Sequence, residues 1–385
     1  MITKKMILGL VAITSFILVS FQNCGTGFTT LTDIASNSSN AVNPTPVSSS
    51  QIITGKYSPG TFNLGAATLA QTMLFASWDP LVAGTMVPNP MLVNYEVNMP
   101  LWTDGAIKNR WMAIPAQSSI NNIGGAPTWT FPNGSVFVKQ FNLTMSDGSI
   151  KRIETRVATL QNNIWVGYLY KWKDDGSDAL LVTADMTDTY LAQDPNTPAQ
   201  SVSVNWNHSV TNCAKCHSQA AGYVLGVNPL QLNKSFNYKV GARNQIKTFS
   251  DAGLLSVSVS DPSILPAYPG LADTTISVQN RARAYLSVNC SVCHQPGGFA
   301  TPFISIDFRS TTSLAMTNLI GVAPTISLAL GAGEARINSG NKALSDVFAR
   351  MSSLTNGTRM PLVGSSVLHQ EAINLIGQWI DSGPQ

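Results

Sequence analysis

The stretch TWTFPNGSVFVKQFNLTM, residues 128–145, alternates apolar and polar side chains in the manner typical of a β-strand. Two similar stretches follow it, SIKRIETRVATLQ at 149–161 and NIWVGYLYKWK at 163–173. All three are rich in Val, Ile, Thr and aromatic residues, and the turn sequences SDG, QNN and DDG punctuate them. The sequence therefore predicts a β-meander. Its first strand should begin late or lie at an edge, because Pro132 cannot donate a ladder hydrogen bond.

The chain takes on a helical character after about residue 200. One apolar stripe at helical spacing in residues 276–289 consists of Val278, Ala282, Tyr285 and Leu286. A second stripe near the C-terminus consists of Ala372, Leu375, Ile376, Trp379 and Ile380. Gly383 and Pro384 follow it as a helix stop. We therefore expect a multidomain protein with an N-terminal mainly-β domain and a mainly-α region after it.

Composition narrows the class of protein. The 385 residues are 44% hydrophobic, which is ample for a core, and only 11% are charged. The net charge of +3 is small, and no basic stripe gathers, so a nucleic-acid partner is not expected. The length favours two or three compact units.

The N-terminus predicts export. Lys4 and Lys5 precede an apolar run that ends near Phe21, too short for a comfortable membrane span, so residues 1–23 are interpreted as an export signal. An uncleaved anchor is the alternative. Cys24 follows in the position of the lipid-modified cysteine of bacterial lipoproteins, although residues 21–23 differ from the usual recognition sequence. Residues 24–55 are polar and without periodicity, which predicts a disordered tether.

Two short motifs account for four of the five cysteines. Cys-x-x-Cys-His occurs at 213–217 and again at 290–294, and Cys290 lies 73 positions after His217. A zinc ribbon would need cysteine pairs roughly 15–20 residues apart, and a thioredoxin-like exchange site needs no histidine after the second cysteine. The arrangement matches covalent c-type haem, in which two thiols hold the porphyrin and the histidine binds the iron. The repeat predicts two haems.

Each haem needs its own set of residues. The thiols would be Cys213 and Cys216 for the first haem and Cys290 and Cys293 for the second, with His217 and His294 as the proximal iron ligands. Met360, in NGTRMPLVG, is predicted to bind the second iron from the opposite side, with Met351 as its competitor. For the first iron the candidates for the opposite side are His208, Met99 and Met112, or the position is open. His369 is assigned to packing or solvent.

The chain resembles a family of uncharacterised exported bacterial diheme c-type cytochromes. The phrases that carry the resemblance are LWTDGAIKNRWMAIP (101–115), FPNGSVFVKQF (131–141), ETR (154–156), YLYKWKDDGSDALLV (168–182), LGVNPLQLN (225–233), RARAYLSVNCSVCH (281–294) and RMPLVG (359–364). The resemblance implies the same cysteine and histidine attachments and suggests Met360 as ligand. Residues 274–385 resemble a class I cytochrome c domain. Before residue 90 nothing is carried over.

The phrase LWTDGAIKNRW leaves two interpretations open. It is either a structural loop packed by its two tryptophans, with Asp104, Lys108 and Arg110 in surface or propionate-facing ion pairs, or a cover over a haem. Arg and Lys beside haem carboxylates suit the chemistry of charge-assisted hydrogen bonds.

These observations divide the chain into an export signal (1–23), a tether (24–55), a β-rich domain (56–200), a first haem segment (201–273) and a class I cytochrome c-like domain (274–385). The leading functional hypothesis is one-electron transfer in the cell envelope, in the periplasm or at the outer membrane through a lipid anchor, with redox proteins as donor and acceptor. One alternative is a diheme peroxidase-like oxidoreductase with an open first haem. The other is a haem-bearing surface binding module in which Trp129, Trp165 and Trp172 line a sugar site.

Overall fold

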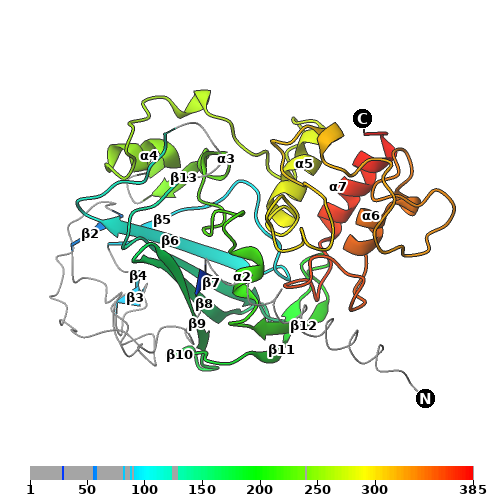
Figure 1. Ribbon diagram of the computed structural model, residues 1–385. Helices are drawn as coiled ribbons and strands as arrows, with labels where there is room; N and C mark the ends of the chain where they lie inside the picture. Colours follow the sequence, from blue (N-terminus) through cyan, green and yellow to red (C-terminus); the bar gives the residue numbers. More distant parts are fainter. Residues whose placement is uncertain are drawn as a thin grey trace, which may run out of the picture.

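A computed structural model describes residues 28–29, 55–58, 81–82, 87–88, 91–123, 129–238 and 241–384 (Figure 1). The predicted export signal, Cys24 and almost all of the predicted tether lie outside the described residues. No described helix is long and apolar enough to cross a membrane.

An eight-stranded sheet dominates the described part of the chain. Its strands run in the order β1-β9-β8-β7-β6-β2, while β10 pairs with β9 and β5 pairs with β6. These strands are β1 (Phe28–Thr29), β2 (Lys56–Tyr57), β5 (Val93–Asn94), β6 (Ile107–Pro115), β7 (Val136–Thr144), β8 (Ile150–Gln161), β9 (Ile164–Trp172) and β10 (Ala179–Leu181). The predicted meander is β7, β8 and β9, which pair antiparallel with their neighbours in sequence. Its first strand begins late, four residues after Pro132.

Three two-stranded sheets and several short helices complete the described structure. The hairpins are β3 (Leu81–Val82) with β4 (Val87–Pro88), β11 (Met186–Gln193) with β12 (Ser201–His208), and β13 (Ser235–Tyr238) with β14 (Gly241–Asn244). The α-helices are α2 (Cys213–Cys216), α3 (Pro229–Leu232), α4 (Gln245–Asp251), α5 (Val278–Asn289), α6 (Asp346–Met351) and α7 (Gln370–Asp381). The 3-10 turns are η3 (Pro262–Ile264), η4 (Leu314–Met316) and η5 (Lys342–Leu344).

Both faces of the large sheet carry a hydrophobic core. Successive side chains of a strand point to opposite faces, so Val136 and Val138 of β7 belong to one core while Phe137 belongs to the other. In the second core, Ile246 and Phe249 of α4 pack on the sheet residues. Figure 1 shows α3 and α4 above the sheet, with α5, α6 and α7 gathered at one end of it.

The two helices predicted from apolar stripes are present as α5 and α7, and they contact each other. Their buried side chains include Tyr285 and Leu286 on one helix and Ile376 and Trp379 on the other, in a single core. Gly383 has a φ of +75°, the left-handed conformation that glycine adopts readily after a helix end.

The prediction of a mainly-α region after the β domain is wrong. The structure is 27% strand and only 19% helix. From residue 274 onward the α-helices are α5, α6 and α7, of 12, 6 and 12 residues, and most of the remaining chain there is turn or irregular. The periodicity that indicates helix is confined to the two stripes. Glycines with positive φ, among them Gly297, Gly321 and Gly340, interrupt the chain between them.

The segment after residue 200 departs from the helical expectation in the same way. It opens with strand β12, whose partner β11 precedes residue 200, and it contains the β13–β14 hairpin. Its three helices have four, four and seven residues. The alternating sequence SVSVNWNH of β12 carries a period of two, and this signal was available in the sequence.

Candidate functional site

The first Cys-x-x-Cys-His motif forms one helical turn directly after β12. Asp185 holds the preceding loop, because its carboxylate accepts hydrogen bonds from the backbone of Val210 (2.8 Å) and Thr211 (3.1 Å) and from the hydroxyl of Ser209 (2.8 Å). Helix α2 then spans the two cysteines, and the amide of His217 donates to the carbonyl of Cys213 at 2.9 Å. The motif is therefore a tight turn that follows a loop held in place by Asp185.

The His217 ring is oriented by the backbone. The carbonyl of Tyr223 accepts a hydrogen bond from Nδ1 at 2.6 Å, which leaves the lone pair of the neutral ring on Nε2. Burial lowers the pKa of His217 to about 4, so the ring is neutral at physiological pH. Tyr223 has a φ of +59°, a conformation that is unusual for a bulky residue and is often found at functional sites.

The second motif begins at the end of α5 and repeats the same turn. The amide of His294 donates to the carbonyl of Cys290 at 2.9 Å, matching the corresponding hydrogen bond of the first motif. The amide of Ala300 donates to the carbonyl of Cys293, which folds the following loop back onto the motif. A side chain on Gly298 would collide with that carbonyl, so glycine is required for this close approach.

His294 has an unsatisfied ring nitrogen. Its Nδ1 is buried and has no hydrogen-bond partner among the described residues. The ring packs edge-on against Phe308, with 5.6 Å between the ring centroids. Burial, with a further contribution from Arg350, lowers the pKa of His294 to about 4. A neutral imidazole with a buried nitrogen that lacks a partner is suited to binding a metal ion.

The two motifs, far apart in sequence, lie in contact. The thiol of Cys293 donates to the carbonyl of Lys215 at 3.2 Å. The interaction of the neighbouring Cys216 and Cys293 thiols lowers the pKa of Cys216 and raises that of Cys293. The ammonium of Lys215 lies 5.7 Å from the centroid of the Phe299 ring. The structure therefore combines the two predicted attachment sites in one place.

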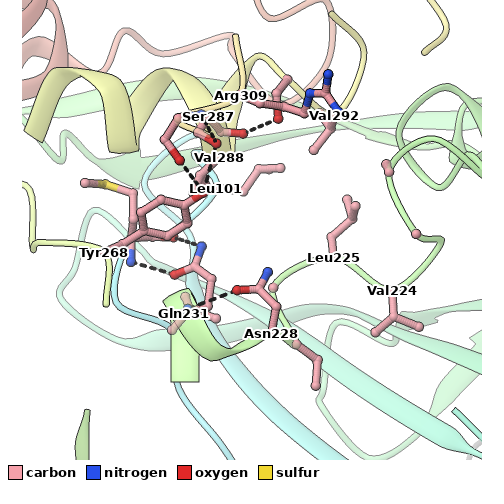
Figure 2. A pocket seen from close by; sticks show the side chains of 18 of the residues that line it. Leu101, Val224, Leu225, Asn228, Gln231, Tyr268, Ser287, Val288, Val292 and Arg309 are labelled. Carbon is pink, nitrogen blue, oxygen red and sulfur yellow. Dashed lines mark hydrogen bonds between the residues drawn. The ribbon is translucent and has the colours of Figure 1, made fainter. Parts of the chain in front are cut away.

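A cavity of about 150 Å³ lies between residues 220–228, which follow the first motif, and residues 287–295, which contain the second motif. We call it the inter-motif cavity. Figure 2 shows Val224 and Leu225 on one wall and Val288 and Val292 on the facing wall. Gln231 closes another side, where its amide oxygen accepts from the Met99 backbone at 2.9 Å and its amide nitrogen donates back at 2.8 Å.

A second cavity, of about 80 Å³, lies between the first motif and the large sheet; we call it the sheet cavity. Cys213 and His217 line it from one side, and Lys139 and Arg156 line it from the sheet. Lys139 also lines the inter-motif cavity, together with Arg110. Cationic side chains of the sheet therefore face both cavities.

Three of these cations stand directly beside one another on neighbouring strands; we call Arg110, Lys139 and Arg156 the cationic row. Arg110 of β6 is the Cα partner of Lys139 of β7, which is the Cα partner of Arg156 of β8. The interpretation of LWTDGAIKNRW singled out Lys108 and Arg110 but missed Lys139 and Arg156. The register that aligns them depends on how the strands pair, and no local pattern gives it.

A small cavity of about 20 Å³ contains the predicted distal ligand of the second site. Cys290, Met351, Met360 and His369 line it. His294 is not among its lining residues, so the structure brings Met360 to Cys290 and does not place it beside the histidine. His369, assigned to packing, stacks on Trp102 with 3.9 Å between centroids, and its Nδ1 lies 3.2 Å from the Tyr285 hydroxyl.

His208, one of the three distal candidates for the first site, is occupied elsewhere. The side chain is fully buried, with Nδ1 2.8 Å from the carboxylate of Glu154 and Nε2 3.1 Å from that of Asp188. Both ring nitrogens are therefore used in structural hydrogen bonds. Met112 is fully buried in a sheet core, whereas Met99 is fully buried at the wall of the inter-motif cavity.

The tryptophans considered for a sugar site are not on the surface. Trp129, Trp165 and Trp172 are 7%, 6% and 3% exposed, and they belong to the two cores of the sheet. Aromatic residues at alternate strand positions here serve packing.

The donor set fits haem c by chemistry. The described part of the chain contains four cysteines, none of them in a disulfide, arranged as two thiol pairs each followed by a neutral histidine. No described cluster of three or more His, Cys, Asp or Glu side chains could hold a bare metal ion. The three cavities described above are each smaller than the roughly 300 Å³ that is usual for small-molecule sites. No known family model, curated protein or solved structure matches the chain.

Proposed function

We propose that the protein is a diheme c-type cytochrome that transfers single electrons. The observation that carries the proposal is the repeated turn. Cys213–His217 and Cys290–His294 each contain an equivalent backbone hydrogen bond of 2.9 Å, and the two motifs lie in contact. Bound there, haem would supply one-electron redox chemistry at its iron. The contact between the motifs suits a two-centre relay within one chain.

The residues of the chain would attach and orient the two groups. Each of the four thiols would hold the group through a thioether, because addition of S–H across a vinyl double bond would form one C–S and one C–H bond without a net change of oxidation state. His217 would present Nε2 to the iron, because the Tyr223 carbonyl holds its Nδ1–H. The small cavity that Met360 shares with Cys290 would bring Met360 toward the second group. Export to the cell envelope, with Cys24 as a lipid site, is part of the same proposal.

Motif variants test the count of haems. Replacing Cys213 and Cys216 together by alanine should halve the haem content per protein, and replacing Cys290 and Cys293 should do the same. The matched control is Ser291→Ala, a change inside the second motif that removes no thiol. Pyridine haemochrome absorbance against protein concentration measures the ratio. Unchanged content in both double variants would reject covalent attachment at these motifs.

Met360→Ala should lower one of two midpoint potentials by on the order of 100 mV and leave the other nearly unchanged, because a thioether ligand favours reduced iron. Met351→Ala is the matched control, since Met351 lines the same cavity beside Cys290. Spectroelectrochemical titration of both variants gives the potentials. Two unaltered potentials in Met360→Ala, or the shift appearing in Met351→Ala instead, would remove Met360 as the ligand.

A specific observation favours a second candidate, a diheme peroxidase-like oxidoreductase. Both nitrogens of His208 are engaged by carboxylates, so this histidine does not supply a sixth ligand at the first site. An open position on one iron would permit peroxide to bind. Electron paramagnetic resonance of the oxidised protein distinguishes the two functions: a high-spin signal with peroxide turnover supports the enzyme, and two low-spin signals without turnover support the carrier.

A further inference from the structure

The cationic row has little negative charge around it: Arg110 is buried, whereas Lys139 is partly buried and the Arg156 side chain is 34% exposed. Like charges directly opposite each other on neighbouring strands destabilise a sheet. Of the three, Arg156 alone forms an ion pair. The carboxylate of Glu154 lies 2.6 Å from its Nε and 2.5 Å from its Nη2, and the same carboxylate also binds His208. No described Asp or Glu forms an ion pair with Arg110 or Lys139.

The contacts of the two unpaired cations do not replace an anion. Arg110 is only 9% exposed, and its guanidinium donates to the carbonyl of Lys108 at 3.2 Å. The amino group of Lys139 lies 5.3 Å from the Phe141 ring centroid and makes no hydrogen bond or ion pair to a described residue, and burial together with the charge of Arg110 holds its pKa well below the ordinary lysine value. Lys108 donates to the carbonyl of Leu101, and burial together with the charge of Arg110 lowers its pKa to about 7.

The position of the row points to the anion that completes it. Lys139 and Arg156 line the sheet cavity with Cys213 and His217, and Arg110 and Lys139 line the inter-motif cavity with Ser291 and Gln295. A porphyrin held by a motif at these cavities brings two carboxylates on one edge. Guanidinium and ammonium groups bind carboxylates by charge-assisted hydrogen bonds that are strongest where water is excluded.

We propose that Arg110, Lys139 and Arg156 form a carboxylate-binding site of the sheet that receives the propionates of haem, with Lys139 at its centre. The inference rests on the proposed function and assigns the sheet a role in it. The sheet is then a wall of the haem site, and not a separate module for binding a partner. Its cations offset the propionate charge and favour the reduced iron.

The test is the midpoint potential of Lys139→Met. Removing the central cation should lower one potential by about 59 mV, a tenfold change in the ratio of oxidised to reduced iron at fixed potential. Lys139→Arg should restore the wild-type value, because it keeps the charge. Arg110→Met provides a second lowering variant. Lys151→Met is the matched control, since Lys151 is a cation of the same sheet in an exposed ion pair with Asp174.

The haem count separates two kinds of failure. Wild-type protein without haem would overturn both the proposed function and this inference. Full haem content in Lys139→Met and Arg110→Met, with potentials equal to those of the wild type and the Lys151→Met control, would overturn the carboxylate site alone. An equal shift in Lys139→Arg would show that packing, and not charge, causes the change, and would also overturn it.

Discussion

Replacing Glu154 by glutamine should lower the free energy of unfolding by about 3–5 kcal/mol, the range for breaking a buried ion pair. Glu154 is fully buried between Arg156 and His208. Burial alone would raise its pKa, but Arg156 and His208 together hold the pKa below its ordinary value. The glutamine variant leaves Arg156, whose side chain is 34% exposed, without its carboxylate, and it removes the buried charge partner of His208.

Chemical denaturation at neutral pH measures this loss. The control is Asp174→Asn, which breaks the Lys151–Asp174 ion pair, in which the Asp174 side chain is 94% exposed; this should cost less than about 1 kcal/mol. A loss below about 1 kcal/mol in Glu154→Gln as well would contradict the account of Glu154 as the principal counter-charge of Arg156.

Lowering the pH from 7 to 4 should reduce the free energy of unfolding through His369 by about 2–3 kcal/mol. Burial first, and then the positive charge of Lys108, lower the pKa of His369 to about 4. The unfolded state, with an ordinary histidine pKa near 6.5, therefore takes up the proton first. The stability that His369 contributes is present above pH 6.5 and is lost as the pH falls toward 4.

His369→Phe isolates this effect, because phenylalanine keeps a ring against Trp102 but cannot take up a proton. Denaturation curves at a series of pH values should fall less steeply for the variant than for the wild type. The variant lacks the hydrogen bond to Tyr285 at every pH. That loss changes the free energy of unfolding by the same amount throughout the pH series and leaves its pH dependence unchanged. Parallel curves for the two proteins would contradict the assigned pKa.

The sequence predicted elements whose signal is local. The period of two in residues 149–161 and 163–173 identified β8 and β9, and the stripe ending in Ile376, Trp379 and Ile380 identified α7. The mainly-α assignment failed because two helices were extended to the irregular chain between them. In that chain turns at Gly321 and Gly340 break any period.

The sequence identified the candidate cysteines and histidines of the site, but it did not show which other segments of the chain surround them. Two motifs of five residues specify the thiols and histidines, but the contact of Cys293 with Lys215 joins segments 78 residues apart. The row of Arg110, Lys139 and Arg156 likewise depends on the pairing register of three strands. His208 stayed an open candidate from the sequence because its carboxylate partners, Glu154 and Asp188, come from other strands.

The most direct test of the central claim is the intact mass of the mature protein, purified from a host that attaches haem to exported proteins, together with its visible spectrum. We predict a mass greater than that of the processed polypeptide by two haems, with any lipid in addition, and a strong Soret band. A mass that matches the polypeptide alone, or one lowered by two hydrogens through a disulfide between Cys216 and Cys293, with no Soret absorbance, would contradict it.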